Sequence, residues 1–178
     1  YSENYFKDSF NVTDRVVDYM LRNDDDIFVL QWSNPEMTKQ HMSISDNAGR
    51  DWRIAVFPKN GLEQTDESAF YLFDDEEDSL FVGVARDYQS ADVYKANSYF
   101  RDFVLSIPHI KAPDFTQMES LEGIYVVNQF VTSTTKDPNS PVKTKISFNK
   151  GADWSLLTPP VKDSLGAKSN CATTVCIR

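Results

Sequence analysis

This chain of 178 residues has little of what catalytic, metal-binding and membrane-spanning segments require. No apolar run is long enough to cross a bilayer, and no segment has the features of a signal peptide. Only two histidines and two cysteines are present, and both histidines lie far from the cysteines in sequence. A zinc site would need further ligands, so we expect no metal and no cofactor. A G-x-S-x-G nucleophile elbow and a phosphate-binding loop are also missing.

Basic residues are few as well. Lys and Arg number 18 against 27 Asp and Glu, which gives a formal net charge of −9. This balance disfavours nucleic acid and anionic membrane surfaces as partners, because both attract positive charge. Much of the acidic excess lies in two turns, at 23–26 and 74–78. Neither turn has the ligand spacing of a calcium loop, so we interpret both as solvated turns.

The chain does contain a repeat. The pattern S-x-N-x-G-x-D-W occurs twice, starting at Ser45 and again 102 residues later at Ser147. A degenerate third copy lies midway at 96–103, where only the Asp and the final aromatic survive, and the two acidic turns have the same spacing. A period of about 50 residues is typical of repeat architectures. The residues that define the two full copies are Ser45, Asn47, Gly49, Asp51 and Trp52, then Ser147, Asn149, Gly151, Asp153 and Trp154.

Each full copy predicts a β-hairpin with a specialised turn. Ser and Asn side chains hydrogen-bond to nearby backbone groups, and Gly allows positive φ at no steric cost. The residues before each copy alternate polar and apolar, and the apolar stretch after each copy stops at proline. Two more strands are predicted upstream of each hairpin position, and no amphipathic helix is found. These strands are 16–21 and 27–32, 69–73 and 80–85, and 115–121 and 124–130.

Two strands and a hairpin make four strands per repeat, the composition of a propeller blade. The predicted fold class is therefore all-β: a β-propeller segment of about three four-stranded blades plus part of a fourth. A blade buries its faces only against its neighbours, so we expect the chain to be a segment of a longer domain. The expected blade units are approximately 1–13, 14–61, 62–112 and 113–160, followed by a cysteine-containing connection at 161–178.

Two features bear on the compartment. Cys171 and Cys176 enclose four residues, which suits a small-loop disulfide in an oxidising compartment or two free thiols in the cytosol. Asn11-Val12-Thr13 is a glycosylation acceptor, with Asn11 as the modified residue. Together they favour a lumenal or extracellular location.

The repeated pattern is that of the Asp-box, a hairpin found in several propeller families. Longer strings narrow the choice: LEGIYVVN at 121–128, VKTKISFNKGADWSLL at 142–157, and then the cysteine pair. With these strings the chain resembles the Vps10 domain of the sortilin family of sorting receptors. The resemblance implies a ten-bladed propeller in a lumenal receptor ectodomain, followed by a cysteine-rich module, a single membrane span and a sorting tail. It also implies non-catalytic binding of peptide, propeptide or protein cargo, carried between Golgi, endosomes and cell surface.

The resemblance also points to tunnel residues. In animal members an arginine just before the strand that enters an Asp-box pairs with a peptide carboxylate, and that position falls here at 38–41, which has no arginine. Lys39, next to Gln40, could supply a point charge without the bidentate geometry of arginine. Gln31 and Tyr71 fall at other tunnel positions. The structural alternative is an exposed strand start at Lys39 and an ordinary blade aromatic at Tyr71.

Two other functions remain open on the residues alone. Asp-box propellers include sialidases, which need an arginine cluster for the substrate carboxylate and a tyrosine nucleophile. The arginines here are scattered, at positions 15, 22, 50, 53, 86, 101 and 178, and form no such cluster in sequence. The other alternative is a non-catalytic adhesive scaffold that binds proteins on its outer surface.

Overall fold

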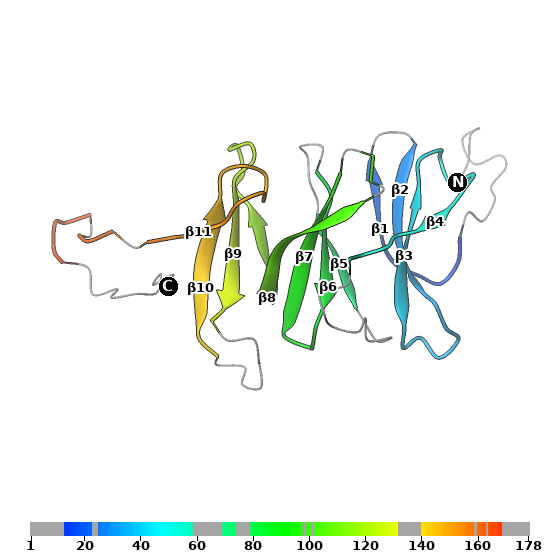
Figure 1. The fold of residues 1–178 in the computed structure, drawn as a ribbon, viewed down its shortest axis with the longest axis horizontal. Helices are drawn as coiled ribbons and strands as arrows, with labels where there is room; N and C mark the ends of the chain where they lie inside the picture. Colours follow the sequence, from blue (N-terminus) through cyan, green and yellow to red (C-terminus); the bar gives the residue numbers. More distant parts are fainter. Residues whose placement is uncertain are drawn as a thin grey trace.

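The structure is a computed structural model that describes residues 13–22, 25–58, 69–73, 79–97, 99–100, 102–131, 140–158, 160–162 and 164–168. All named secondary-structure elements within these residues are β-strands, and the strands form two antiparallel sheets. The sheet orders are β1-β2-β3-β4 and β11-β10-β9-β8-β7-β6-β5. Figure 1 shows the sheets standing side by side along the longest axis of the molecule. The predicted all-β class is confirmed.

The first sheet, blade 1, contains β1 (Val16–Arg22), β2 (Asp26–Trp32), β3 (Gln40–Ser45) and β4 (Arg53–Ile54). β4 is shorter than the predicted strand because the chain turns inward after Ile54. Ala55 still donates its N–H to the carbonyl of Met42 at 2.8 Å, and Phe57 then enters the core with 5% exposure. Burial of this aromatic ring is worth about 2 kcal/mol, which is comparable to two additional ladder bonds of about 1 kcal/mol each.

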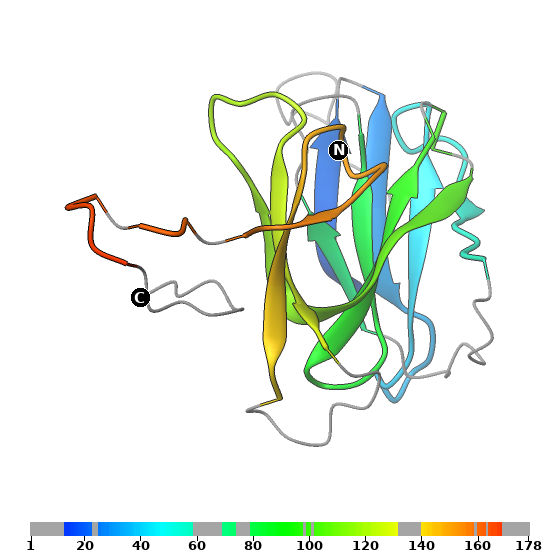
Figure 2. The same cartoon turned by 60° about the vertical axis from the view of Figure 1, so that its left-hand side comes forward.

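The second sheet has seven strands because one long strand serves two groups. β8 (Phe103–Gln117) has 15 residues and pairs with β7 through its first half and with β9 through its second half. Register shifts interrupt the ladder on both sides, and Figure 2 shows β8 curving from one group to the other. The sequence predicts a separate strand at 115–121. Instead β8 ends at Gln117, and a turn with a bond from the N–H of Leu121 to the carbonyl of Met118 follows.

We call the two groups of this sheet blade 2 and blade 3. Blade 2 consists of the first half of β8 with β5 (Phe70–Phe73), β6 (Phe81–Ala85) and β7 (Ser90–Ala96). Blade 3 consists of the second half of β8 with β9 (Tyr125–Phe130), β10 (Val142–Ser147) and β11 (Ser155–Leu156). In each blade the fourth strand is the outermost one, paired with the third by the repeated hairpin.

Two hydrophobic cores separate the three blades. The first core lies between blades 1 and 2 and the second between blades 2 and 3. β6 supplies both, because successive side chains point to opposite faces of a strand. Its Val82 enters the first core and its Phe81 enters the second, each at 0% exposure. The blade faces that meet one another are therefore largely apolar, as stacked repeats require.

Candidate functional site

The two full copies of the pattern form turns with matching hydrogen bonds. Ser45 accepts the backbone N–H of Gly49 on its Oγ at 2.9 Å, and Ser147 accepts that of Gly151 at the same distance. Both glycines have positive φ, 82° and 73°. Both serines are buried, at 1% and 0% exposure. The hydroxyl thus replaces a backbone acceptor inside the turn, which explains why serine suits this position.

The Asn and Asp of each pattern form a second set of bonds. Asn47 accepts the backbone N–H of Asp51 on Oδ1 at 2.9 Å, and its Nδ2 donates to the Asp51 carboxylate at 2.8 Å. Asn149 and Asp153 repeat both bonds, each at 2.9 Å. In each turn, the Asn side chain therefore bonds to both the backbone and the side chain of the Asp. The predicted β-hairpins are confirmed by the antiparallel pairs β3–β4 and β10–β11.

The degenerate third copy uses a residue that the pattern did not single out. Asn97 donates its Nδ2 to the carboxylate of Asp102 at 2.9 Å, as Asn47 does to Asp51. Its backbone N–H also bonds to the carbonyl of Asp102 at 2.9 Å. The signal was present, since an Asn lies at the start of a short connection, but it is shifted by one position from the aligned copies.

The turns also connect neighbouring blades. Arg53 donates to the carbonyl of Phe100 at 2.9 Å, which joins the blade 1 hairpin to the third-copy turn of blade 2. Trp154 donates its Nε1 to the hydroxyl of Ser106 in β8 at 3.1 Å, and Ser106 donates to the carbonyl of Gly151 at 2.6 Å. In both junctions a residue of one hairpin contacts the adjacent blade. The pattern residues therefore stabilise the turns, and the hairpins help to hold neighbouring blades together.

The predicted tunnel residues in blade 1 lie at the end of the sheet near the β2–β3 connection. Gln31 is 9% exposed, and its Nε2 donates to the carbonyl of Asp14 at 3.0 Å and to the hydroxyl of Thr13. Gln40 accepts the backbone N–H of Phe70 on Oε1 at 3.2 Å and so joins blades 1 and 2. Because Gln31 pairs with His41 and Gln40 with Trp32, these two glutamines lie on opposite faces of the sheet.

The other two predicted residues are not brought together with them. Lys39 donates its backbone N–H to Asn34 Oδ1 at 2.9 Å, which orders the chain just before β3. Tyr71 packs against the second core, with its ring 6.4 Å from that of Phe73. Gln31 therefore faces the segment before β1, Gln40 faces blade 2, and Tyr71 faces blade 3. Together they do not form one pocket in the described part of the chain.

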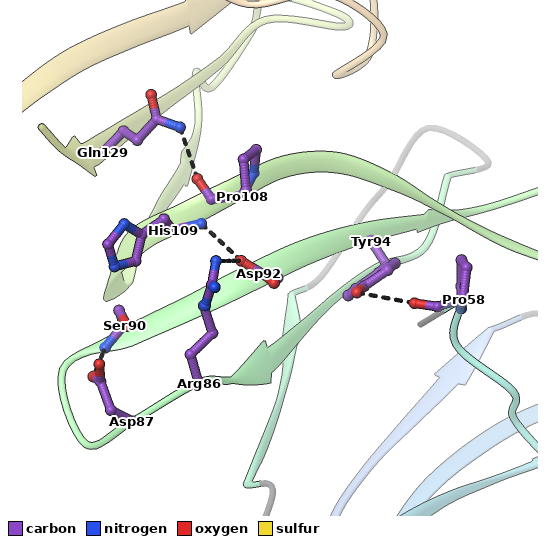
Figure 3. A network of polar contacts seen from close by, with 9 residues as sticks. All are labelled: Pro58, Arg86, Asp87, Ser90, Asp92, Tyr94, Pro108, His109 and Gln129. Atoms are coloured by element: carbon purple, nitrogen blue, oxygen red, sulfur yellow. Dashed lines mark hydrogen bonds and ion pairs between the residues drawn. The ribbon is translucent and has the colours of Figure 1, made fainter. Parts of the chain in front are cut away.

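A polar cluster that sequence reasoning missed lies where β8 passes from blade 2 to blade 3 (Figure 3). Asp92 Oδ1 accepts both the guanidinium of Arg86 at 3.2 Å and the backbone N–H of His109 at 2.8 Å. Asp92 and His109 are each 6% exposed. His109 has a φ of 60°, so the backbone departs from the extended conformation at this point. The ion pair thus holds the irregular segment of β8 against β7.

Figure 3 shows two further hydrogen bonds, one at this junction and one between blades 1 and 2. Gln129 donates its Nε2 to the carbonyl of Pro108 at 2.7 Å, and Tyr94 donates its hydroxyl to the carbonyl of Pro58 at 3.4 Å. The first joins blade 3 to β8, and the second joins the end of blade 1 to blade 2. No sequence signal indicated these partners, because they are far apart along the chain.

Both histidines titrate below their usual range. Burial lowers the pKa of His109, and the nearby Arg86 lowers it further, while Asp87 and Asp92 act in the opposite direction. Burial alone lowers the pKa of His41. Each imidazole is therefore held in its neutral form in the folded protein at neutral pH.

Several predicted features lie outside the described residues: Asn11, Cys171, Cys176 and the acidic turn at 74–78. Among the residues that are described, no group of three or more His, Cys, Asp and Glu side chains is placed to hold a metal ion. The same residues include no helix that is long and apolar enough to cross a membrane.

A four-stranded and a seven-stranded antiparallel sheet stack as three four-stranded blades, of which blades 1 and 3 end in a hairpin of the repeated pattern, and this arrangement defines the protein class as a segment of a β-propeller. A protein-family model, Sortilin-Vps10, described as "Sortilin, neurotensin receptor 3", matches residues 1–177. The chain belongs to this family.

Individual relatives agree with this assignment. The chain is 29% identical to vacuolar protein sorting/targeting protein 10 of Aspergillus terreus, over 97% of this chain and 12% of the relative. It is 32% identical to the protein of that name in Talaromyces marneffei, over 79% of this chain and 10% of the relative. It is 29% identical to vacuolar protein sorting/targeting protein PEP1 of Saccharomyces cerevisiae, over 97% of this chain and 11% of the relative. The chain thus spans 12% or less of the length of these curated relatives.

Proposed function

We propose that this chain is part of the lumenal ligand-binding domain of a sorting receptor that binds peptide, propeptide or protein cargo. The observation that carries the proposal is the family match over residues 1–177, in a chain whose sheets stack as blades. The receptor would carry its cargo between Golgi, endosomes and cell surface. Its other parts would be the remaining blades, a cysteine-rich module and a membrane span elsewhere in the longer protein.

Ligand contacts in this segment would come from the inner strands and the connections next to them. β1 is an edge strand, and its Tyr19 and Leu21 are 63% and 62% exposed. Lys39, Gln40, Gln31 and Tyr71 lie at the positions that the family resemblance indicates. Of these four, Lys39 alone carries a positive charge, which suits a carboxylate as a point charge.

Binding without catalysis is supported by how the arginines are used. A sialidase-type site would need several guanidinium groups directed at one substrate carboxylate. Arg53 instead donates to the carbonyl of Phe100, and Arg86 pairs with the buried Asp92. Both are committed to contacts that hold the blades together. We therefore propose that the segment binds cargo and does not transform it.

The test uses the full receptor ectodomain and two synthetic peptides that differ only in a free or amidated C-terminus. We expect isothermal titration calorimetry to show about two- to fivefold tighter binding of the free carboxylate, as one partly exposed charge pair provides. Lys39→Gln should abolish the difference. Lys143→Gln, which removes an exposed lysine of β10, is the matched control and should preserve it.

Two results would contradict the proposal. Absence of binding for every peptide and propeptide offered to the intact ectodomain would exclude the receptor function. Turnover of a fluorogenic sialoside by the same protein would exclude the non-catalytic function. A carboxylate preference that survives Lys39→Gln would leave the receptor function standing and remove Lys39 from the site.

A further inference from the structure

Strands β9 and β10 of blade 3 have a face that points away from blade 2. Tyr125 and Val127 of β9 lie in the second core, which blades 2 and 3 share. Val126 lies between them, so its side chain is on the opposite face, together with that of its partner Ile146. Both are half-buried, and neither belongs to a core of the described residues. We call this surface the far face of blade 3.

The far face corresponds to the faces that blades 1 and 2 bury. Ile44 and Ile146 each come directly before the first serine of a pattern copy. Ile44 and its partner Phe28 are 1% and 0% exposed, because blade 2 packs against them. Phe81 is the equivalent residue of blade 2, and it is buried against blade 3. One further blade would bury the far face in the same way, as stacked repeats require.

A row of hydrogen-bonded polar side chains crosses the far face. Thr144 of β10 donates its hydroxyl to Asn128 Oδ1 of β9 at 2.8 Å, and Asn128 donates its Nδ2 to Asp114 Oδ2 of β8 at 3.1 Å. In blade 1 the positions of Thr144 and Asn128 are occupied by apolar residues, Met42 and Leu30, which pair in the same register and lie in the first core. A junction on the far face would therefore bury polar groups where the first junction buries apolar ones.

The carboxylate at the end of this row is only partly satisfied. Within the described residues Asn128 alone donates to Asp114, and it reaches one of the two oxygens. An ionised carboxylate accepts several hydrogen bonds and has no donor. Asp114 is already half-buried, whereas Asp18, at the equivalent position of blade 1, is exposed with blade 2 in place. Another blade on the far face would take more water from Asp114, and a covered carboxylate needs a donor or a cation.

Both existing junctions satisfy polar groups of the corresponding faces from the next blade. Gln40 of blade 1 accepts the backbone N–H of Phe70 of blade 2 on Oε1 at 3.2 Å. Lys95 of blade 2 donates its Nζ to the carbonyl of Lys150 of blade 3 at 2.7 Å. A polar side chain on such a face thus finds its partner in the repeat that follows.

We propose that the far face is the junction with the next repeat of the receptor, and that this repeat supplies a lysine or arginine side chain to Asp114. The inference rests on the proposed function, in which the chain is part of a longer propeller. The carboxylate of Asp92 shows how the fold satisfies a covered acid, since it pairs with Arg86 and accepts a backbone N–H. The new junction would combine the apolar contacts of Val126 and Ile146 with one charged pair.

The first experiment labels the carboxyl groups of the intact ectodomain with a carbodiimide and glycinamide, and mass spectrometry quantifies each site. Asp18 and Asp92 are internal references, because Asp18 is exposed and Asp92 is 6% exposed and ion-paired. We expect Asp114 to react like Asp92 and at least about tenfold more slowly than Asp18, because the reaction requires the junction to open. In urea all three should react at similar rates, which assigns the difference to the fold.

The second experiment tests the charge. Asp114→Asn keeps the size of the side chain and an acceptor for Asn128, and it removes the partner of the proposed cation. We expect it to lower the melting temperature of the intact ectodomain by about 2–5 °C, as loss of one member of a buried charge pair does. Asp18→Asn removes an exposed carboxylate at the equivalent position of blade 1 and should leave the melting temperature unchanged.

Three outcomes would overturn the inference. Labelling of Asp114 as fast as that of Asp18 would show that no blade covers the far face, and this result requires no variant to fold. Protection of Asp114 with an unchanged melting temperature in Asp114→Asn would exclude the cation. Equal losses in Asp114→Asn and Asp18→Asn would indicate an effect of net charge alone. None of these measurements involves cargo, so an ectodomain that binds no peptide would contradict the receptor function and leave this inference standing.

Discussion

Replacement of Gly151 by alanine tests whether the second hairpin is pressed against the neighbouring blade. A Cβ atom added at this position would lie 2.7 and 2.9 Å from two ring carbons of Phe81 and 2.9 Å from Ser106 Oγ. Phe81 is completely buried in the second core, so its ring has no free space to move into. The substitution therefore forces blades 2 and 3 apart locally.

The expected cost has two parts. Overpacking of a filled core costs about 1–3 kcal/mol, and a non-glycine residue in the left-handed region costs about 1 kcal/mol more. Gly151 has a φ of +73° and incurs both. Gly166 has a φ of +83° but no atom within 4 Å of an added Cβ, so it incurs the second part alone. We expect Gly151→Ala to destabilise the protein by about 2–4 kcal/mol and Gly166→Ala by about 1 kcal/mol.

Urea denaturation of the intact ectodomain, followed by tryptophan fluorescence, measures the difference. Trp154 lies in the affected hairpin and packs against the second core, so its emission reports on this junction. Equal midpoints for Gly151→Ala and Gly166→Ala would refute the reasoning, because they would mean that the close approach to Phe81 does not constrain the blades.

Three further predictions concern the blade junctions. Arg86→Leu leaves the buried Asp92 without its cation and should cost about 2 kcal/mol by denaturation, reduced from the value for a fully buried pair because Arg86 is partly exposed; a neutral result would contradict the structural role of the pair. Ser106→Ala removes two hydrogen bonds to the second hairpin and should cost about 1–2 kcal/mol, whereas Ser106→Thr should restore part of this. The lowered pKa of His109 means that the unfolded chain takes up a proton first as the pH falls, so stability should decrease below pH ~6.5. His109→Gln should flatten the dependence of the melting temperature on pH between about 7 and 5, and an unchanged slope would exclude His109 as the cause.

The hairpins and most strands could be predicted because their signals are local. A Ser, an Asn and a Gly within a few residues determine which backbone groups of the turn find partners, so the pattern predicts its own bonds. The alternation of polar and apolar residues predicts the strands, and the repeat period predicts similar groups of strands, so together they predict the all-β class. The third copy shows the limit of such predictions. Its equivalent residue, Asn97, lies one position before the aligned Asn of the full copies, so the pattern does not identify it.

The positions of the candidate binding residues could not be predicted in this way, because they depend on how strands from distant parts of the chain pair and pack. Gln40 and Tyr71 face different blades, although each matches a position indicated by the family resemblance. Which face a side chain occupies depends on the register between strands and on the irregular segments of β8, and neither leaves a local signature.

The sequence alone is sufficient to predict the repeat, its hairpin turns, the strand content and the family, since each depends on residues within one turn or one strand. Two features required the folded chain: the shared strand β8 and the Arg86–Asp92–His109 cluster. They arise where strands from distant parts of the chain come into contact. Such contacts follow from how the blades pack, which no short stretch of residues encodes.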